Sequence, residues 1–206
     1  MANIAAVEAP DSTPVSAAAM RILCKLARFL FGGGAIHESI ATRMHIDAAP
    51  ESVWSGIAFY EEVPGKPPAL LASILFPLGT EGEKSEVGAR ILCRYRQGNL
   101  VKEITAVEIP CIIRFDVMEQ HLGIESCAIA RSGSYRILCQ GAGSEVVLTT
   151  NYRAFLHPRW VWRLVEKLAL HQLHGHILNG MSTMVAVGDR PAMRVTTGRV
   201  CRGEEA

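Results

Sequence analysis

The sequence has no pair of cysteines at the spacing of a metal or redox motif. Its six cysteines are spread along the chain: Cys24, Cys93, Cys111, Cys127, Cys139 and Cys201. Zinc ribbons and thiol redox sites need cysteines separated by about two residues, so both classes of site are excluded. Several of the cysteines lie in strand-like segments, where a free thiol behaves as a small apolar side chain. We therefore expect free thiols, no disulfides and a reducing, cytoplasmic location.

The sequence also lacks an excess of charge and a long apolar run. Lysine and arginine number 21 against 20 aspartates and glutamates in 206 residues, so the net charge is only +1. Such a balanced chain has no field to attract a polyanion, which argues against nucleic-acid binding. Charges interrupt every apolar run well short of the roughly 20 residues that a membrane span needs. Glu8 and Asp11 precede any apolar run, which fits neither a secretory signal nor a transit peptide.

Signatures of common enzyme classes are missing as well. The chain contains no P-loop, no dinucleotide-binding fingerprint and no G-x-S-x-G elbow. The glycine triplet at 32–34 has no strand before it and no lysine-bearing helix after it, so it is predicted to end a helix. We expect no cofactor and no metal, and the sequence leaves open whether the protein is an enzyme.

Hydrophobic residues make up 49% of the chain, enough to build a core or to line a cavity. Its later strand-like segments are separated by short turns, such as Gln97-Gly98-Asn99 and Gly141-Ala142-Gly143, which are typical of antiparallel hairpins. The predicted elements are a helix at 18–31, a strand at 38–46, a helix at 47–57, mostly loop at 58–85, strands at 87–96, 100–108, 111–119, 127–140 and 145–155, and a long helix at 158–181.

These elements divide the chain into three parts. We expect a flexible arm and amphipathic helix over 1–35, one domain over 36–184 and a polar tail over 185–206. In the amphipathic helix, Arg21, Lys25 and Arg28 form a narrow basic stripe on an otherwise apolar cylinder. One interpretation is peripheral contact with an anionic membrane, or with a partner, through residues 18–31. The other is that the broad apolar side packs on the domain and leaves the three cations in water.

The order of elements and several short motifs resemble a known superfamily. Residues 46–54, IDAAPESVW, match a strand followed by an A-P-x-x-V-W helix start, and residues 133–137, GSYRI, match a late-strand pattern. Residues 145–152, EVVLTTNY, and 158–162, PRWVW, complete the match. The motifs are similar to those of the START-like, helix-grip superfamily, and within it to bacterial polyketide cyclase/dehydrase and lipid-transport proteins. The resemblance covers about residues 38–182.

The resemblance implies an α+β helix-grip fold, in which a curved antiparallel sheet wraps around one long C-terminal helix and leaves an apolar cavity between them. Members of this superfamily bind lipids, quinones, sterols or polyketides in the cavity, and some are cyclases or dehydratases. The matching motifs are structural, so they indicate the fold more strongly than the chemistry. Two departures, the basic N-terminal helix and a proline-rich insertion at 62–68, leave the shape of the cavity entrance open.

The long helix supplies the first candidate ligand-binding residues. At about 100° per residue, one apolar face and its polar continuation consist of Val161, Val165, Leu168, Gln172, His176 and Asn179. Burying the polar groups without partners would cost about 1 to 3 kcal/mol each, so they are predicted to meet groups of the sheet, water in the cavity or a ligand. In the last case they form the polar end of the ligand pocket. His176 is also the candidate catalytic acid or base. The alternative is a histidine bonded to the backbone or to water.

The sheet supplies the second set of candidates, which are Ile113, Phe115, Tyr95, Tyr135 and Tyr152. A tyrosine hydroxyl that reaches the cavity would hydrogen-bond a ligand oxygen. The alternative is that the tyrosines fill the core and keep their hydroxyls at its rim. His171 and His174 share one face of the long helix, but no cysteine or carboxylate stands beside them, so a zinc site is not expected.

Three functions remain open from the sequence. The first is binding or carriage of a hydrophobic small molecule, such as a lipid, a quinone or a polyketide-like compound, in an internal cavity. The second is a cyclase or dehydratase acting on a polyketide-like substrate there, with His176 or a tyrosine moving protons. The third is an interaction protein whose cavity is filled by side chains and whose 18–31 helix docks on a membrane or partner. The ligand and the oligomeric state are left open.

Overall fold

The computed structural model describes residues 17–58, 75, 77–82, 86–187 and 201. Helix α1 (Ala17–Phe31) leads directly into strand β1 (Gly32–Ile46), and helix α2 (Pro50–Ala58) follows. The later strands are β2 (Pro77–Glu81), β3 (Arg90–Tyr95), β4 (Gly98–Glu108), β5 (Ile112–His121), β6 (Ala128–Gln140) and β7 (Gly143–Leu156). The long helix α4 (Arg159–Val187) comes after them.

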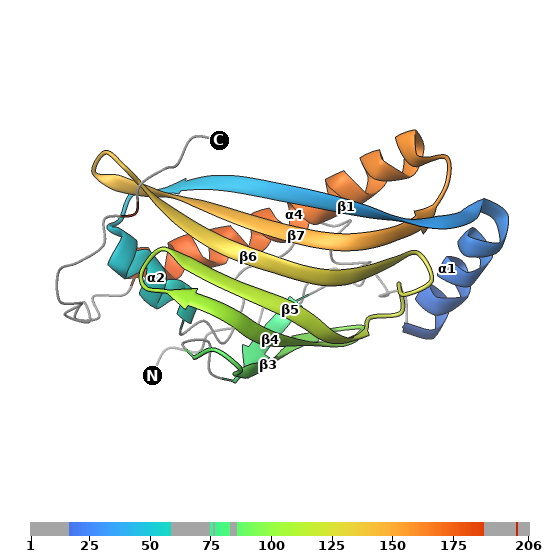
Figure 1. Ribbon diagram of the computed structural model, residues 1–206, viewed down its shortest axis with the longest axis horizontal. Coiled ribbons are helices and arrows are strands. Elements are labelled where there is room, and N and C mark those ends of the chain that lie inside the picture. Colours follow the sequence, from blue (N-terminus) through green and yellow to red (C-terminus); the bar gives the residue numbers. More distant parts are fainter. Residues whose placement is uncertain (1–16, 59–74, 76, 83–85, 188–200, 202–206) are drawn as a thin grey trace, which may run out of the picture.

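The seven strands form one antiparallel sheet in the order β1-β7-β6-β5-β4-β3-β2. Sequential strands from β2 to β7 pair with one another, as the short turns predict. Strand β1 closes the far edge by pairing with β7, from Ile36 opposite Ala154 to Ile46 opposite Ser144. The sheet is curved, and α4 runs along one face of it, with α2 at one end of the molecule and α1 at the other (Figure 1). This arrangement confirms the predicted α+β helix-grip architecture.

The inward face of the sheet, α2 and α4 enclose one hydrophobic core. Pro50 suits the first position of α2 because a proline there gives up no helical hydrogen bond. Three residues of this short helix, Val53, Trp54 and Ile57, are buried in the core. The most deeply buried apolar side chains of the sheet and of α4 include Ile104, Ile137, Val146, Leu178 and Met181.

The elements differ from the predicted ones most clearly in three places. The glycine triplet ends α1 as predicted, but β1 starts there rather than at residue 38. Strand β2 lies in a region predicted as mostly loop. The strand was not predicted because its sequence, PLGTE, has no apolar alternation. Helix α4 continues to Val187, past its predicted end at 181. The apolar run at 70–76 lies largely outside the described residues. No helix within the described ranges is both long and apolar enough to cross a bilayer.

A disulfide joins Cys111, just before β5, to Cys201, which corrects the expectation of free thiols only. The two cysteines are 90 residues apart in the sequence, so no local spacing indicates the pair. Cys201 is buried, and its carbonyl accepts a hydrogen bond of 3.2 Å from the backbone N–H of Cys139. The bond therefore fastens one point of the predicted polar tail to the sheet. The free thiols of the described residues are Cys24, Cys93, Cys127 and Cys139.

Candidate functional site

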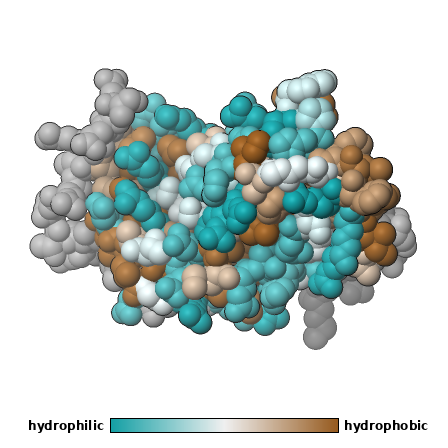
Figure 2. Space-filling view, turned by 45° about the vertical axis from the view of Figure 1, so that its right-hand side comes forward, coloured by the Kyte–Doolittle hydropathy of each residue, from teal (hydrophilic) through white to brown (hydrophobic). Residues whose placement is uncertain are grey.

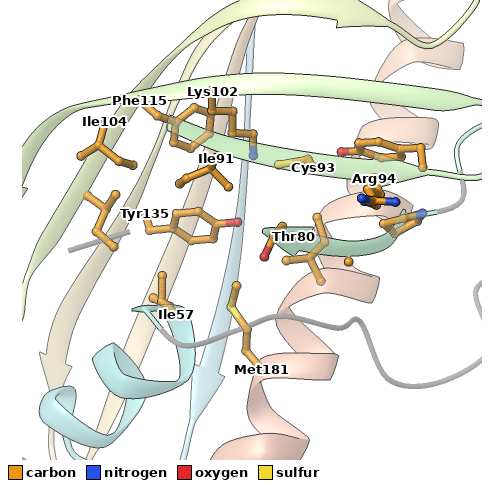
Figure 3. A pocket seen from close by; sticks show the side chains of 15 residues that line it. Ile57, Thr80, Ile91, Cys93, Arg94, Lys102, Ile104, Phe115, Tyr135 and Met181 are labelled. Carbon is orange, nitrogen blue, oxygen red and sulfur yellow. The ribbon is translucent and has the colours of Figure 1, made fainter. Parts of the chain in front are cut away.

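A cavity opens between the inward face of the sheet, the end of α2 and the second half of α4 (Figure 3). Its volume is about 60 Å³, and about 610 Å³ when the space out to its solvent-exposed mouth is included. A sizeable guest would therefore extend into the mouth. The lining, which is mostly apolar, consists of Ile57, Pro77, Gly79, Thr80, Ile91, Cys93, Arg94, Tyr95, Lys102, Ile104, Ile113, Phe115, Tyr135, Ile177 and Met181. An apolar pocket with a few polar groups is typical of small-molecule sites.

Alternation along the strands determines which side chains line the cavity. In β3, Ile91, Cys93 and Tyr95 alternate along the strand and line it, and Arg94 of the same strand also contributes to the lining. Gly133 of β6 lies opposite Phe115 of β5 in the sheet register. A Cβ atom at Gly133 would lie 2.5 Å from Cζ of the Phe115 ring, so glycine is required for the ring to lie against the sheet.

Three polar side chains give the lining its chemical character. Figure 3 shows the amine of Lys102 and the hydroxyl of Tyr135 directed into the space between the sheet and α4. Burial raises the pKa of Tyr135 and of Tyr95, so both hydroxyls keep their protons. Burial by itself lowers the pKa of Lys102, but neighbouring groups, among them Cys93 through a side-chain hydrogen bond, raise it above its ordinary value. The amine therefore stays charged, 4.2 Å from the centre of the Phe115 ring.

Lys102 is not among the predicted residues, although the sequence carries a signal for it. Leu100, Lys102 and Ile104 occupy every second position of β4, and both Leu100 and Ile104 are buried. With a period of two, a cation between two buried residues faces the same side as they do. A charged residue on an otherwise apolar inward face is therefore the pattern that would have identified it.

The predicted ligand-binding residues divide into two groups. Tyr95, Ile113, Phe115 and Tyr135 line the cavity. The predicted residues of α4 do not. Val165 is 51% and Leu168 52% exposed, Asn179 is exposed, and Val161 is half-buried outside the lining. The side of α4 that faces the sheet is instead formed by Arg159, Glu166, Leu170, His174, Ile177 and Met181, about half a turn from the predicted face.

Gln172 and His176 lie on the outward side of α4 but are at least partly buried. Oε1 of Gln172 and Nε2 of His176 make no hydrogen bond to any described residue. Burial lowers the pKa of His176, so its ring is neutral. Neither residue lines the cavity. The catalytic role of His176 therefore stays a prediction.

The two histidines that share a face of α4, His171 and His174, both contact Thr42 of β1. Oγ1 of Thr42 lies 2.7 Å from Nδ1 of His171 and 2.9 Å from Nδ1 of His174. Oγ1 of Thr150 lies 2.8 Å from Nε2 of His174. Burial, together with His171 and Lys102, lowers the pKa of His174 to about 3, so this ring is neutral. In the described part of the chain, no three His, Cys, Asp or Glu side chains are grouped to hold a metal ion.

Tyr152, predicted to bind a ligand, lies in a cluster of ion pairs and does not line the cavity. Its hydroxyl donates a hydrogen bond of 2.8 Å to Glu166. Arg159 donates to the same carboxylate through two nitrogens, at 2.9 and 2.6 Å, and contacts Glu38 of β1 at 3.1 Å. The charged members of the cluster are largely buried. The cluster therefore joins the first turns of α4 to β1 and β7.

Neither a protein-family model nor a curated protein matches the sequence. Solved structures match the fold. Norcoclaurine synthase from Thalictrum flavum, in complex with dopamine and hydroxybenzaldehyde, aligns with a TM-score of 0.51 and 12% identity over 92% of this chain and 100% of that chain. A protein from Thermus thermophilus aligns with a TM-score of 0.50 and 18% identity, over 74% of this chain and 100% of that one. At such identities the likeness concerns the fold alone. With the curved seven-stranded sheet and the long α4, these matches show that the chain has the helix-grip fold.

Proposed function

We propose that the protein binds and carries a hydrophobic small molecule in the cavity between the sheet and α4. The lining is the observation that carries this proposal, because isoleucines, a phenylalanine and a methionine surround a few polar groups and the cavity opens to solvent. An apolar guest would remove apolar surface from water, which contributes roughly 25 cal/mol per Å². A lipid, a quinone or a polyketide-like compound has the apolar body that such a lining suits.

Native mass spectrometry of the purified protein tests for a guest that is retained during purification. The neutral fluorescent probe N-phenyl-1-naphthylamine tests the cavity itself. The Ile177→Trp variant places an indole in the cavity, whereas Ile109→Trp places the same group on an exposed turn. We expect probe affinity to fall at least tenfold in the first variant and to stay within twofold in the second. Equal affinity in the two variants, both folded by circular dichroism, would eliminate the cavity as the binding site.

A cyclase or dehydratase acting on a polyketide-like substrate in the same cavity is the second candidate. The ionisable groups of the lining, Lys102, Tyr95 and Tyr135, favour it. So does the fold likeness to norcoclaurine synthase, whose solved complex holds dopamine and hydroxybenzaldehyde. The predicted acid or base is His176 or a tyrosine. His176 lies outside the lining, and His176→Ala tests whether it takes part in the reaction. Loss of turnover with binding retained supports the role, and unchanged turnover removes His176 from the mechanism.

For the cellular location, we propose the cytoplasm, because four of the six cysteines are free thiols. The Cys111–Cys201 disulfide argues the other way, since cytosolic thiols are normally kept reduced. Alkylation of the free thiols in cells lysed directly into denaturant separates the two cases. Modification of Cys111 and Cys201 under denaturing alkylation supports a reducing compartment, and their protection contradicts it.

A further inference from the structure

Lys102 is the feature of the cavity that a purely apolar guest leaves unexplained. It stands on β4 between the buried residues Leu100 and Ile104, and its amine points into the cavity (Figure 3). Arg94, the other basic residue of the lining, is paired with Glu81 at 2.8 Å. Lys102 differs, because no carboxylate of a described residue forms a salt bridge with it.

Cys93 gives this ammonium a sulfur partner but no carboxylate, and its other neighbours are neutral. The ring of Phe115 lies 4.2 Å away, and a cation–π contact compensates the charge only in part. Tyr95 and Tyr135 supply no negative charge, because burial raises the pKa of each hydroxyl. His174 lies within electrostatic range of Lys102 and is a neutral ring. A cation in a mostly apolar lining is unfavourable without a counter-charge, so the cavity is complementary to an anion.

We propose that the guest is an amphipathic carboxylic acid whose carboxylate pairs with the Lys102 ammonium while its apolar body lies against the isoleucines. This inference rests on the proposed function and adds the charge of the ligand to it. The Tyr135 hydroxyl faces the same space and can donate a hydrogen bond to the second carboxylate oxygen (Figure 3). A neutral alcohol of equal length would leave the lysine without a counter-charge and should bind more weakly.

Displacement of N-phenyl-1-naphthylamine by dodecanoate and by dodecanol tests the inference. In the wild type we expect dodecanoate to bind at least tenfold more tightly than dodecanol. In Lys102→Met this preference should disappear while dodecanol affinity changes less than twofold, and in Lys102→Arg the preference should persist. The matched control is Lys167→Met, which removes an exposed cation of α4 outside the cavity.

Two failures are distinguishable. If dodecanol binds as tightly as dodecanoate to the wild type, the acidic ligand is wrong and the apolar cavity site stands. If neither compound displaces the probe, the proposed function and this inference fail together. The wild-type comparison needs no variant, so it decides the question even where Lys102→Met does not fold.

A second inference comes from an independent observation at the end of the molecule that carries α1. Its helix-end surface consists of the exposed apolar side chains of Ile22, Leu26 and Phe29 on α1 and Trp160, Leu164 and Leu168 on α4. Phe29 is 85% and Trp160 74% exposed. Figure 2, in which this end comes forward, shows hydrophobic residues gathered at its right-hand side. The rings of Phe31 and Trp162 lie 5.6 Å apart, so the two helices meet.

The helix-end surface is apolar because both helices bury other faces. The first turns of α4 turn Arg159 and Glu166 toward β1 and β7, which leaves the apolar side of the helix outward. Helix α1 buries only a narrow strip that includes Met20 and Cys24. Of the two interpretations of this helix, the one in which its broad apolar side packs on the domain is therefore wrong. Trp160 is exposed because α4 buries the opposite side. Contiguous exposed apolar surface of this kind marks an interaction site.

The exposed charges of α1 and of the first turns of α4 have one sign. Arg21, Lys25 and Lys167 are exposed, and Arg163 is 65% exposed. Helix α1 contains no acidic residue, and Glu166, the acidic residue among the first turns of α4, is buried in its ion pairs. Apolar and aromatic side chains flanked by cations are the pattern of a helix that lies in a membrane interface.

We propose that the helix-end surface docks on an anionic lipid bilayer. Phe29 and Trp160 would enter the interface, and the flanking cations would meet anionic headgroups. A second copy of this chain is the less favourable occupant, because a symmetric contact would bring the same cations of two protomers together. Of the three predicted stripe cations, Arg28 takes no part, since it donates a hydrogen bond of 2.8 Å to the Phe155 carbonyl.

Flotation with vesicles of phosphatidylcholine, with and without one quarter phosphatidylglycerol, tests the docking. We expect binding to the anionic vesicles, and a loss of at least tenfold in Phe29→Ser/Trp160→Ser and in Arg21→Glu/Lys25→Glu. The matched control is Arg136→Glu on the exposed face of β6, which should bind as the wild type does. Absence of wild-type binding overturns the proposal. So does a dimer in sedimentation velocity that Phe29→Ser/Trp160→Ser converts to monomer without any vesicle binding.

Discussion

At the scale of single residues, His174 shows how the fold fixes a charge state. The side chain is 1% exposed, and both ring nitrogens are engaged, one by Thr42 and the other by Thr150. In a neutral imidazole one nitrogen donates and the other accepts, which suits two hydroxyl partners. A second proton would remove the acceptor and place a charge in the core, where His171 and Lys102 also disfavour it.

The pH dependence of stability follows from this neutral ring. The pKa of His174 is about 3 in the folded protein against an ordinary 6.5, so between these values the unfolded chain binds more protons. We expect the unfolding free energy to fall as the pH falls through this window, by at most about 1.4 kcal/mol per pH unit from His174. Urea unfolding at a series of pH values measures the slope.

Carboxylates add their own slope in the lower part of the window, so variants are needed to isolate His174. In His174→Gln the slope between pH 6.5 and 5 should flatten relative to the wild type. His171→Gln is the matched control, because it removes a histidine that contacts the same Thr42 hydroxyl but is only partly buried. An unchanged slope in His174→Gln would mean that other groups cause the dependence.

At the scale of elements, α4 is attached to the sheet in two chemically different ways. Its second half packs Leu173, Leu178 and Met181 into the core. Its first turns are held by charges, since Arg159 bridges Glu166 of the same helix and Glu38 of β1. The three side chains are 11 to 14% exposed, so water screens their interaction only slightly.

Replacing Arg159 should therefore be costly. Arg159→Met leaves the largely buried Glu166 without its cation and Glu38 with only the exposed Arg163, which is expected to lower the unfolding free energy by about 3 to 5 kcal/mol. Arg163→Met is the matched control, because Arg163 contacts the same Glu38 at 3.2 Å but is 65% exposed. Its effect should stay below about 1 kcal/mol. Equal effects in urea unfolding would mean that the buried cluster does not anchor the helix.

The same helix shows what sequence patterns can and cannot predict. The strands from β3 to β7 follow from turn residues and alternation, which act locally, so their order and approximate limits were predictable. The side of α4 that faces the sheet was not predictable, because an angular count along the helix assumes that the apolar side is buried. Here Val165 and Leu168 are outward, since the sheet offers Glu38 and Tyr152 to the first turns of the helix.

The predicted residues of the candidate site also divide into those that a local pattern places correctly and those that it does not. Ile113, Phe115, Tyr95 and Tyr135 were predictable, because inward alternation on a strand places a side chain without knowledge of its partners. Tyr152 follows the same alternation, yet it meets Glu166 rather than the cavity. Such an outcome depends on contacts between distant segments, as does the Cys111–Cys201 bond, and no local pattern encodes them.

At the scale of the whole molecule, the cavity exists only when the sheet and α4 are assembled. Its walls combine Ile57 of α2, Lys102 of β4 and Ile177 of α4, which lie far apart in the sequence. An unfolded chain cannot present these residues together. A ligand of this cavity therefore binds the folded state alone and shifts the unfolding equilibrium by mass action.

N-phenyl-1-naphthylamine at a hundredfold excess over its Kd should raise the unfolding free energy by about 2.7 kcal/mol. Urea unfolding followed by tryptophan fluorescence measures this as a higher midpoint with an unchanged dependence on urea. In Ile177→Trp the increase should vanish, because the indole occupies the cavity. An increase of the same size in that variant would place the probe on the helix-end surface instead. In that case Phe29→Ser/Trp160→Ser, which leaves the cavity lining intact, would be the change that removes the effect.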